Sequence, residues 1–263
     1  MEISADKAFK DLHQLFQLSV NWLSLALGSR QCRLCLAELS LKETFLCQDC
    51  RLALTGTPII ETLPAALSPL AGQKESSEIL CLSLYSYEHR ARLAVQALKY
   101  GRRTELVEPL AKALYTAFAQ AQASIQLDSI QLDGRQILVT AVPLHKSKKK
   151  ERGFNQSELL ARHLASFCAL TYRPLLQRHR QTRAQFGLSK VERFSNLEGA
   201  ISCTDPKLIA GRTVLVVDDV VTSGATALAC SRSLMAAGAN RVIVLALCRA
   251  RLRQSVSGPG PGT

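Results

Sequence analysis

The most informative stretch of this sequence is Val214-Leu215-Val216-Val217-Asp218-Asp219-Val220-Val221-Thr222-Ser223-Gly224-Ala225-Thr226. Its apolar start predicts a buried strand that delivers Asp218 and Asp219 at its carboxyl end, where open α/β sheets bind ligands. Adjacent carboxylates accept hydrogen bonds from a vicinal diol or hold a hydrated Mg²⁺ ion. The small residues 222–226 let backbone N–H groups approach a phosphate at the start of a helix. The stretch therefore predicts a site for a phosphorylated ligand.

Three other interpretations of this stretch compete. An acid pair after an apolar strand is also typical of a Walker B element, but the chain has no Gly-x-x-x-x-Gly-Lys-Ser/Thr loop, which argues against an ATPase. A response regulator carries its acid pair on the first strand, whereas this pair lies near the end of the chain. An ordinary exposed acidic loop is the third interpretation, and it stays open.

Strand and helix patterns extend over most of the remaining chain. Strands are expected near 80–87, 136–142, 213–217 and 241–247, and helices near 89–99, 105–121, 155–170 and 224–237. Asn155 followed by Glu158 is typical of a capped helix start. A weaker strand pattern covers 169–172. Continuous apolar strands that alternate with helices predict a parallel sheet covered on both faces.

Four cysteines near the start form two Cys-x2-Cys pairs, Cys32 with Cys35 and Cys47 with Cys50. No export signal precedes them, so we expect a cytoplasmic, reducing location in which clustered thiols bind metal instead of forming disulfides. Four thiolates at this spacing predict a closed, structural Zn²⁺ site. The other cysteines are scattered in apolar segments, which favours a place in the core.

Composition divides the chain into five expected regions. Residues 1–29 form an amphipathic helix, 30–55 the cysteine module, 56–78 a linker rich in Pro, Gly and Ser, 79–250 the α/β domain, and 251–263 a disordered tail. The helix has apolar residues at helical spacing and polar ones between them, which argues against a membrane span.

The positive charge of the chain is concentrated in one segment. The formal net charge is +12, and residues 145–193 hold twelve Lys or Arg against three Glu. Such a local excess predicts an anionic partner, either a phosphorylated small molecule, nucleic acid or both. A basic surface that serves only solubility is the alternative.

The stretch that ends at Thr226 resembles the phosphoribosyl pyrophosphate signature of type I phosphoribosyltransferases. The resemblance implies that Asp218 and Asp219 hold the ribose 2- and 3-hydroxyls. It also implies that the loop residues bind the 5-phosphate; these are Thr222, Ser223, Gly224, Ala225 and Thr226. The fold implied is a type I phosphoribosyltransferase-like sheet with helices on both faces, preceded by a small four-cysteine zinc-binding module.

Further motifs are similar to one branch of that superfamily, the ComF-type competence proteins and their DNA-utilisation relatives. They are the paired cysteines, Leu98-Lys99-Tyr100-Gly101-Arg102, Val142-Pro143-Leu144-His145, Arg152-Gly153-Phe154-Asn155-Gln156, and the spaced residues Arg178, Arg180, Gln185, Arg193 and Asn196. The resemblance spans about residues 30–249. It implies a role in DNA uptake or in the use of DNA as a nutrient, with other DNA-uptake proteins as partners.

A transferase of this type must neutralise pyrophosphate as it leaves, through cations and Mg²⁺. The resemblance places a pyrophosphate loop at His145–Arg152 and a mobile lid at Arg178, Arg180 and Arg183. We therefore assign Arg152, Arg178 and Arg180 to catalysis. The expected activity is transfer of a phosphoribosyl group from phosphoribosyl pyrophosphate, with Mg²⁺, to an acceptor that the sequence does not identify.

The alternative function is a non-enzymatic protein that binds single-stranded DNA. Lys148, Lys149 and Lys150 form a cluster suited to phosphates of any sequence. Stacking partners for bases are Phe154, Tyr172 and Phe186. Three roles stay open for the lysines: ligand phosphate, nucleic acid, or solvent. Lys99 and Arg102 either cap a helix C-terminus or contact an anion.

Overall fold

The computed structural model describes residues 30–54, 58–63, 79–124, 136–180, 192, 196–197 and 199–250. The chain divides into two compact units, Met1–Leu52 and Ala53–Thr263. The helix expected within residues 1–29 and the tail expected from residue 251 lie outside the described residues. No helix in the described ranges is long and apolar enough to cross a membrane.

The described part of the first unit consists of tight turns followed by the start of helix α2 (Gln48–Ala53). A single β-bridge joins Gln31 to Glu38. The N–H of Cys32 donates to the carbonyl of Ala37 at 2.7 Å, and the N–H of Leu36 donates to the carbonyl of Cys32 at 3.0 Å. These bonds fold the first Cys-x2-Cys pair into a compact knuckle.

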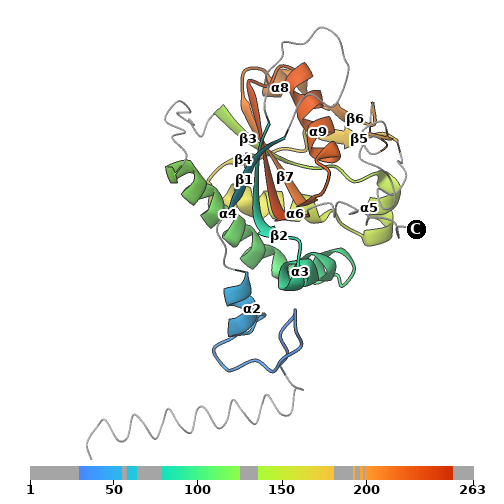
Figure 1. The fold of residues 1–263 in the computed structure, drawn as a ribbon. Coiled ribbons are helices and arrows are strands. Elements are labelled where there is room, and N and C mark those ends of the chain that lie inside the picture. The colour runs from blue at the N-terminus through green and yellow to red at the C-terminus, as the bar shows by residue number, and fades with distance from the viewer. Residues whose placement is uncertain are drawn as a thin grey trace, which may run out of the picture. The chain divides into compact units, whose positions relative to one another are not determined.

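The second unit is built on a six-stranded sheet in the order β1-β2-β8-β7-β3-β4 (Figure 1). The strands are β1 (Ile59–Leu63), β2 (Ile79–Ser86), β3 (Ile137–Ala141), β4 (Thr171–Tyr172), β7 (Thr213–Val221) and β8 (Arg241–Arg249). All neighbours from β2 to β4 pair in parallel. The parallel arrangement expected from the apolar runs is therefore confirmed for these strands.

Strand β1 makes the sheet mixed, because it pairs antiparallel with β2 at one edge. It lies within residues 56–78, for which the sequence predicted a linker. The prediction rested on proline and glycine, and Pro58 and Pro64 do flank the strand. Between them, Ile59, Ile60 and Thr62 are β-branched residues that favour an extended strand.

Helices cover both faces of the sheet. They are α3 (His89–Lys99), the 3₁₀ turn η2 (Thr104–Leu106), α4 (Val107–Ser124), α5 (Lys146–Arg152), α6 (Gln156–Phe167), α8 (Pro206–Ile209) and α9 (Ala225–Ala236). Val214 and Val216 of β7 share a buried cluster with Leu228 of α9. Residues 215 and 217 point to the opposite face, where α6 contacts β7 and β3 and packs on α4.

A separate two-stranded sheet pairs β5 (Leu176–Arg178) antiparallel with β6 (Ile201–Cys203). Helix α9 contacts β6. The sequence patterns did not predict this pair, because strands of three residues are too short to show periodicity.

Candidate functional site

The acid pair lies in β7, one of the two central strands of the sheet. Asp218 and Asp219 belong to β7, which continues to Val221 instead of ending before the acids as the sequence suggested. Their exposed fractions are only 9% and 6%. Two carboxylates in a strand flanked on both sides by other strands are largely removed from water, so neighbouring groups control their charge.

Asp218 is held by two hydrogen bonds to one oxygen. The hydroxyl of Ser157 donates to Oδ1 at 3.1 Å, and the N–H of Asp219 donates to the same atom at 2.8 Å. Burial raises the pKa of Asp218 to about 7, and the neighbouring charge of Asp219 adds to this effect. Asp218 is therefore poised to accept or release a proton near neutral pH.

Asp219 forms an ion pair with Lys99, whose Nζ lies 2.8 Å from Oδ1. Lys99 is the last residue of α3. Burial alone would lower the pKa of the ammonium, but the charge of Asp219 outweighs it and raises the pKa above its ordinary value. The ion pair shows that the ammonium of Lys99 is directed at a carboxylate of the protein itself. The hydrogen bond at the end of α3 comes instead from the N–H of Tyr100 to Gln96.

The N-terminus of α6 joins two strands of the sheet at this site. Asn155 is the N-cap, and its Oδ1 accepts from the N–H of Ser157 at 3.1 Å, which confirms the predicted helix start. Its Nδ2 donates to the carbonyl of Val142, just beyond β3, at 3.0 Å. The cap thus fixes Ser157 where it reaches Asp218 of β7. No sequence pattern singled out Ser157.

The segment expected to form a basic pyrophosphate loop is mostly a helix, α5. His145 is its N-cap, because Nδ1 accepts from the N–H of Ser147 at 3.3 Å. Gly153 ends it in a left-handed conformation with φ of 83°. Lys and Glu are common both in exposed helices and in loops, so the charged composition of this segment did not show which of the two it forms.

Arg152, the last residue of α5, lies beside the start of α6. Its guanidinium donates to Oε1 of Gln156 at 3.2 Å and sits 5.5 Å from the ring centroid of Tyr100. Tyr100 is 73% exposed, whereas Gln156 is 1% exposed. Among the described residues, Nε2 of Gln156 has no hydrogen-bond partner. A buried donor without a partner destabilises the protein by about 1–3 kcal/mol, so it marks a place where a ligand oxygen or water is expected.

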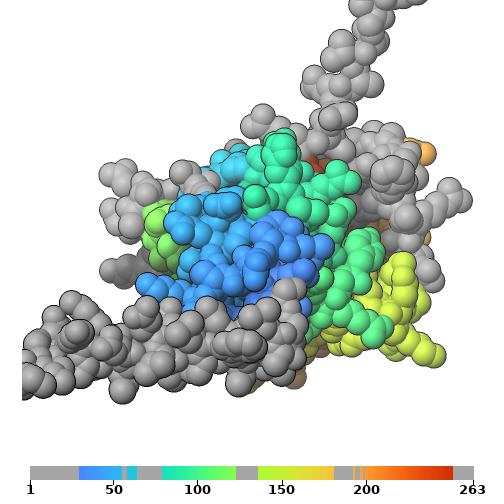
Figure 2. Space-filling model, turned by 90° about the horizontal axis from the view of Figure 1, so that it is seen from below, coloured from blue at the N-terminus to red at the C-terminus, as the bar shows by residue number. Residues whose placement is uncertain are grey.

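The four lysines of α5 are exposed to solvent. The helix has no buried residue and lies on the surface, drawn yellow-green in Figure 2. Lys148 pairs with Glu151 at 2.8 Å, and Lys149 pairs with Glu158 of α6 at 3.1 Å. Exposed pairs of this kind contribute little to stability and exchange readily with other anions.

The arginines expected in a lid differ in their surroundings. Arg178 ends β5, and burial lowers the pKa of its guanidinium while the charge of Asp218 acts in the opposite direction. Arg178 is thus within electrostatic range of the acid pair. Arg180 donates instead to the carbonyl of Asn196 at 3.2 Å. Arg183, Gln185, Phe186 and Arg193 lie outside the described residues.

Residues 222–224 connect β7 to α9. Gly224 is the N-cap of α9 with φ of 82°. The first backbone bond of the helix runs from the N–H of Leu228 to the carbonyl of Gly224 at 2.8 Å. The N–H groups of residues 225–227 therefore have no acceptor within the helix, as is usual at a helix start, and that of Ala225 donates to the hydroxyl of Ser223 at 3.4 Å.

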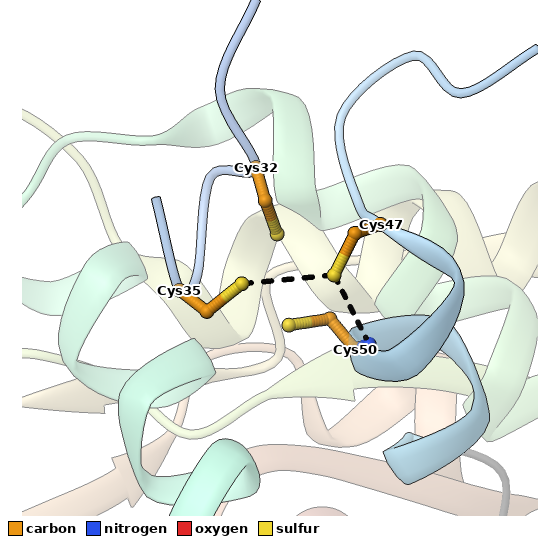
Figure 3. A group of neighbouring side chains, drawn as sticks. All are labelled: Cys32, Cys35, Cys47 and Cys50. Carbon is orange, nitrogen blue, oxygen red and sulfur yellow. Dashed lines mark hydrogen bonds between the residues drawn. The ribbon is translucent and has the colours of Figure 1, made fainter. Parts of the chain in front are cut away.

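The four paired cysteines come together in the first unit (Figure 3). Their sulfur atoms all lie within 4.8 Å of one another, close enough for one metal ion. Burial opposes ionisation of Cys32, but hydrogen bonds from the backbone of Cys35, Cys47 and Leu34 outweigh it and lower the pKa of the thiol to about 6. A thiolate is the form that binds metal, so the cluster can hold an ion.

Several known proteins are similar to this chain. A family model described as "Phosphoribosyl transferase domain" matches residues 155–257. DNA utilization protein YhgH of Salmonella typhimurium is 33% identical over 83% of this chain and 96% of its own length. Competence protein F of Haemophilus influenzae is 26% identical over 84% of this chain and 97% of its own length. Among solved structures, adenine phosphoribosyltransferase from Saccharomyces cerevisiae matches 78% of this chain and 89% of its own, at 14% identity and a TM-score of 0.38.

Proposed function

Because this chain belongs to the ComF family of competence and DNA-utilisation proteins, we propose that it binds phosphoribosyl pyrophosphate with Mg²⁺ and transfers the phosphoribosyl group to an acceptor. One observation carries the proposal: a buried acid pair in β7, held by Ser157 and Lys99, is followed directly by a helix start suited to phosphate. We place the activity in DNA uptake or DNA utilisation, after the names of the relatives.

The acid pair would hold the ribose. Each carboxylate has oxygens left to accept from the 2- and 3-hydroxyls, because Asp218 uses Oδ1 for Ser157 and Asp219 uses Oδ1 for Lys99. The 5-phosphate would lie against the N–H groups and hydroxyls of Thr222, Ser223, Gly224, Ala225 and Thr226. A bound Mg²⁺ would neutralise part of the charge on the pyrophosphate.

The pyrophosphate would be held by Arg152, Arg178 and Arg180. Arg152 is linked to the site through Gln156, to which it donates a hydrogen bond and which is adjacent in sequence to Ser157. The unpartnered Nε2 of Gln156 supports the placement, because a phosphate oxygen would satisfy this buried donor. In the reaction the C1–O bond breaks, pyrophosphate leaves with both bonding electrons, and the acceptor's nucleophile forms the new bond to C1.

We also propose that the four-cysteine cluster holds a structural Zn²⁺ ion, since four thiolates leave no open coordination position. The regions 1–29, 30–55, 56–78, 79–250 and 251–263 remain the proposed division of the chain, with the addition that β1 joins the sheet.

Binding of single-stranded DNA is the second candidate function. It is favoured by α5, which exposes Lys146, Lys148, Lys149 and Lys150 on a helix without buried residues. The exposed ring of Tyr100, with Arg152 over it, offers a stacking surface for a base.

Calorimetric titration with phosphoribosyl pyrophosphate and Mg²⁺ tests the first candidate. We expect the wild type to bind and the Asp218→Asn/Asp219→Asn variant to lose binding, while Glu108→Gln, an exposed acid of α4, behaves as the wild type. A folded, zinc-loaded wild type that shows no binding at millimolar donor would exclude the transferase. Titration with a single-stranded oligonucleotide then tests the second candidate, whose affinity must fall steeply with salt.

A further inference from the structure

The loop that follows β7 is tied back by a side chain from the neighbouring strand. Arg249, the last residue of β8, has a largely buried side chain. Its NH1 group donates to the carbonyl of Val221 at 3.2 Å, to the carbonyl of Thr222, and to the carbonyl of Ala250 at 3.4 Å. One guanidinium nitrogen thus contacts carbonyl groups at the carboxyl ends of both β7 and β8.

The guanidinium is held in turn by β1. Its Nε pairs with Oε1 of Glu61. Two residues further along β1, Leu63 also reaches the loop: a Cβ on Gly224 would lie 3.2 Å from Cδ2 of Leu63. Strand β1 therefore supports the loop in two ways, through the ion pair of Glu61 with Arg249 and through the side chain of Leu63.

The carbonyl contacts determine where the loop's N–H groups point. In a trans peptide the C=O and the N–H of the next residue lie in one plane and point in opposite directions. With the carbonyls of Val221 and Thr222 turned to Arg249, the N–H groups of Thr222 and Ser223 point away from it. The carbonyl of Val221 also accepts from the backbone N–H of Ala250 at 2.9 Å, so the β7–β8 pairing holds it without the guanidinium. The carbonyl of Thr222 depends on Arg249, and without the guanidinium it would be free to turn toward a bound phosphate, which it would repel.

We propose that Arg249, fixed by Glu61, is a positioning residue that aims the backbone N–H groups of the 222–224 loop at a phosphate monoester. The inference rests on the proposed function, because it assumes that this loop receives the 5-phosphate of the donor. Arg249 itself does not touch the ligand. Its effect is confined to the phosphate end of the site, whereas Arg152 and Arg178 lie at the pyrophosphate end.

The test compares three ligands on the full-length, zinc-loaded protein by calorimetry: ribose 5-phosphate, Mg²⁺-pyrophosphate and phosphoribosyl pyrophosphate. We expect Arg249→Met to weaken ribose 5-phosphate and the complete donor by about tenfold, and to leave pyrophosphate binding unchanged. Glu61→Gln removes only the charge that fixes the guanidinium. We therefore expect it to weaken the binding of ribose 5-phosphate and of the complete donor less, by about threefold, with pyrophosphate binding again unchanged. The matched control is Arg241→Met, at the exposed first residue of the same strand.

The outcomes separate the inference from the function on which it rests. Wild-type protein that binds none of the three ligands contradicts the proposed function, and this inference with it. Wild type that binds, with Arg249→Met unimpaired for ribose 5-phosphate, contradicts the inference alone. Equal weakening of all three ligands also overturns it, because it indicates general loss of structure. Should Arg249→Met not fold, the selectivity of Glu61→Gln decides by the same criterion.

Discussion

Nζ of Lys99 lies 2.8 Å from Oδ1 of Asp219, so the end of α3 and the carboxyl-terminal part of β7 meet in one ion pair. The carboxylate is almost fully buried, and the side chain of Lys99 is 21% exposed. A charge so placed depends on its partner, because water reaches it poorly. This single contact joins the motif around Lys99 to the acid pair.

Substitution of Lys99 by Met tests that dependence. We expect Lys99→Met to lower the free energy of unfolding by about 2 kcal/mol, less than for a fully buried pair because solvent reaches the ammonium. The same substitution in an Asp219→Asn background should have much less effect, since no carboxylate is left unpaired. Urea denaturation of the four proteins measures this coupling. Equal losses of unfolding free energy in both backgrounds would show that Lys99 acts through packing alone. The control is Lys112→Met, which replaces an exposed lysine of α4.

The pKa of Asp218 makes stability depend on pH. This pKa is about 7 in the folded protein against an ordinary value of 3.8. Between these values the folded state keeps a proton that the unfolded chain has lost, so stability falls as pH rises toward 7. Asp218→Asn removes this effect, and we expect its Tm to exceed the wild-type Tm by about 3 °C or more at pH 8.

The advantage of Asp218→Asn should shrink on acidification and vanish near the ordinary pKa of 3.8, where both states of the wild type are protonated. Calorimetric scans of both proteins between pH 8 and the ordinary pKa of 3.8 measure the difference in Tm. The cysteines titrate alike in both proteins, so their contribution cancels in this difference. A Tm difference that does not change with pH would contradict the raised pKa.

Gly224 combines a left-handed backbone with a close neighbour. Its φ is 82°, and a Cβ would approach Leu63 to 3.2 Å. Gly211 has φ of 72° but nothing within 4 Å of such a Cβ. Both Gly→Ala changes impose a backbone penalty of about 1 kcal/mol. A larger loss of unfolding free energy in Gly224→Ala than in Gly211→Ala would therefore measure the steric contact with Leu63. Denaturant titration measures the unfolding free energy of both variants. Equal losses would mean that the side chain of Leu63 moves aside without cost.

The cysteine cluster predicts a defined metal content. We expect the purified protein to carry about one zinc ion per chain and to lose it in Cys47→Ser, because three thiolates bind less tightly than four. Cys203→Ser, in β6 and outside the cluster, should retain the metal. Elemental analysis after dialysis gives the ratio. Zinc retained by Cys47→Ser at wild-type affinity would exclude this set of ligands.

Sequence patterns predicted the main elements well where periodicity was long. The helix expected at 89–99 is α3, and the strand expected at 241–247 is the start of β8. The site was harder, because its contacts join distant segments. Asp218 and Asp219 were recognisable from their neighbours, but the bonds from Ser157 and Lys99 arise only once the sheet is assembled.

Two elements were missed for different physical reasons. Helix α5 has no buried residue, so no apolar stripe marked it as a helix. Strand β1 is short and bracketed by Pro58 and Pro64, and these prolines were the stronger signal. Arg249 was not singled out either, because an arginine that follows an apolar strand is ordinarily a solvated end.

The order of the strands has a consequence for biosynthesis. Strands β7 and β8 are the central members of the sheet, yet they come last among the described strands along the chain. While the ribosome translates this protein, β2 and β3 emerge early but have no direct pairing with each other. The apolar side chains of these early strands therefore stay exposed until both central strands have left the exit tunnel of the ribosome. Nascent chains of this protein are accordingly expected to engage chaperones, and translation stalled before β8 should yield aggregating fragments.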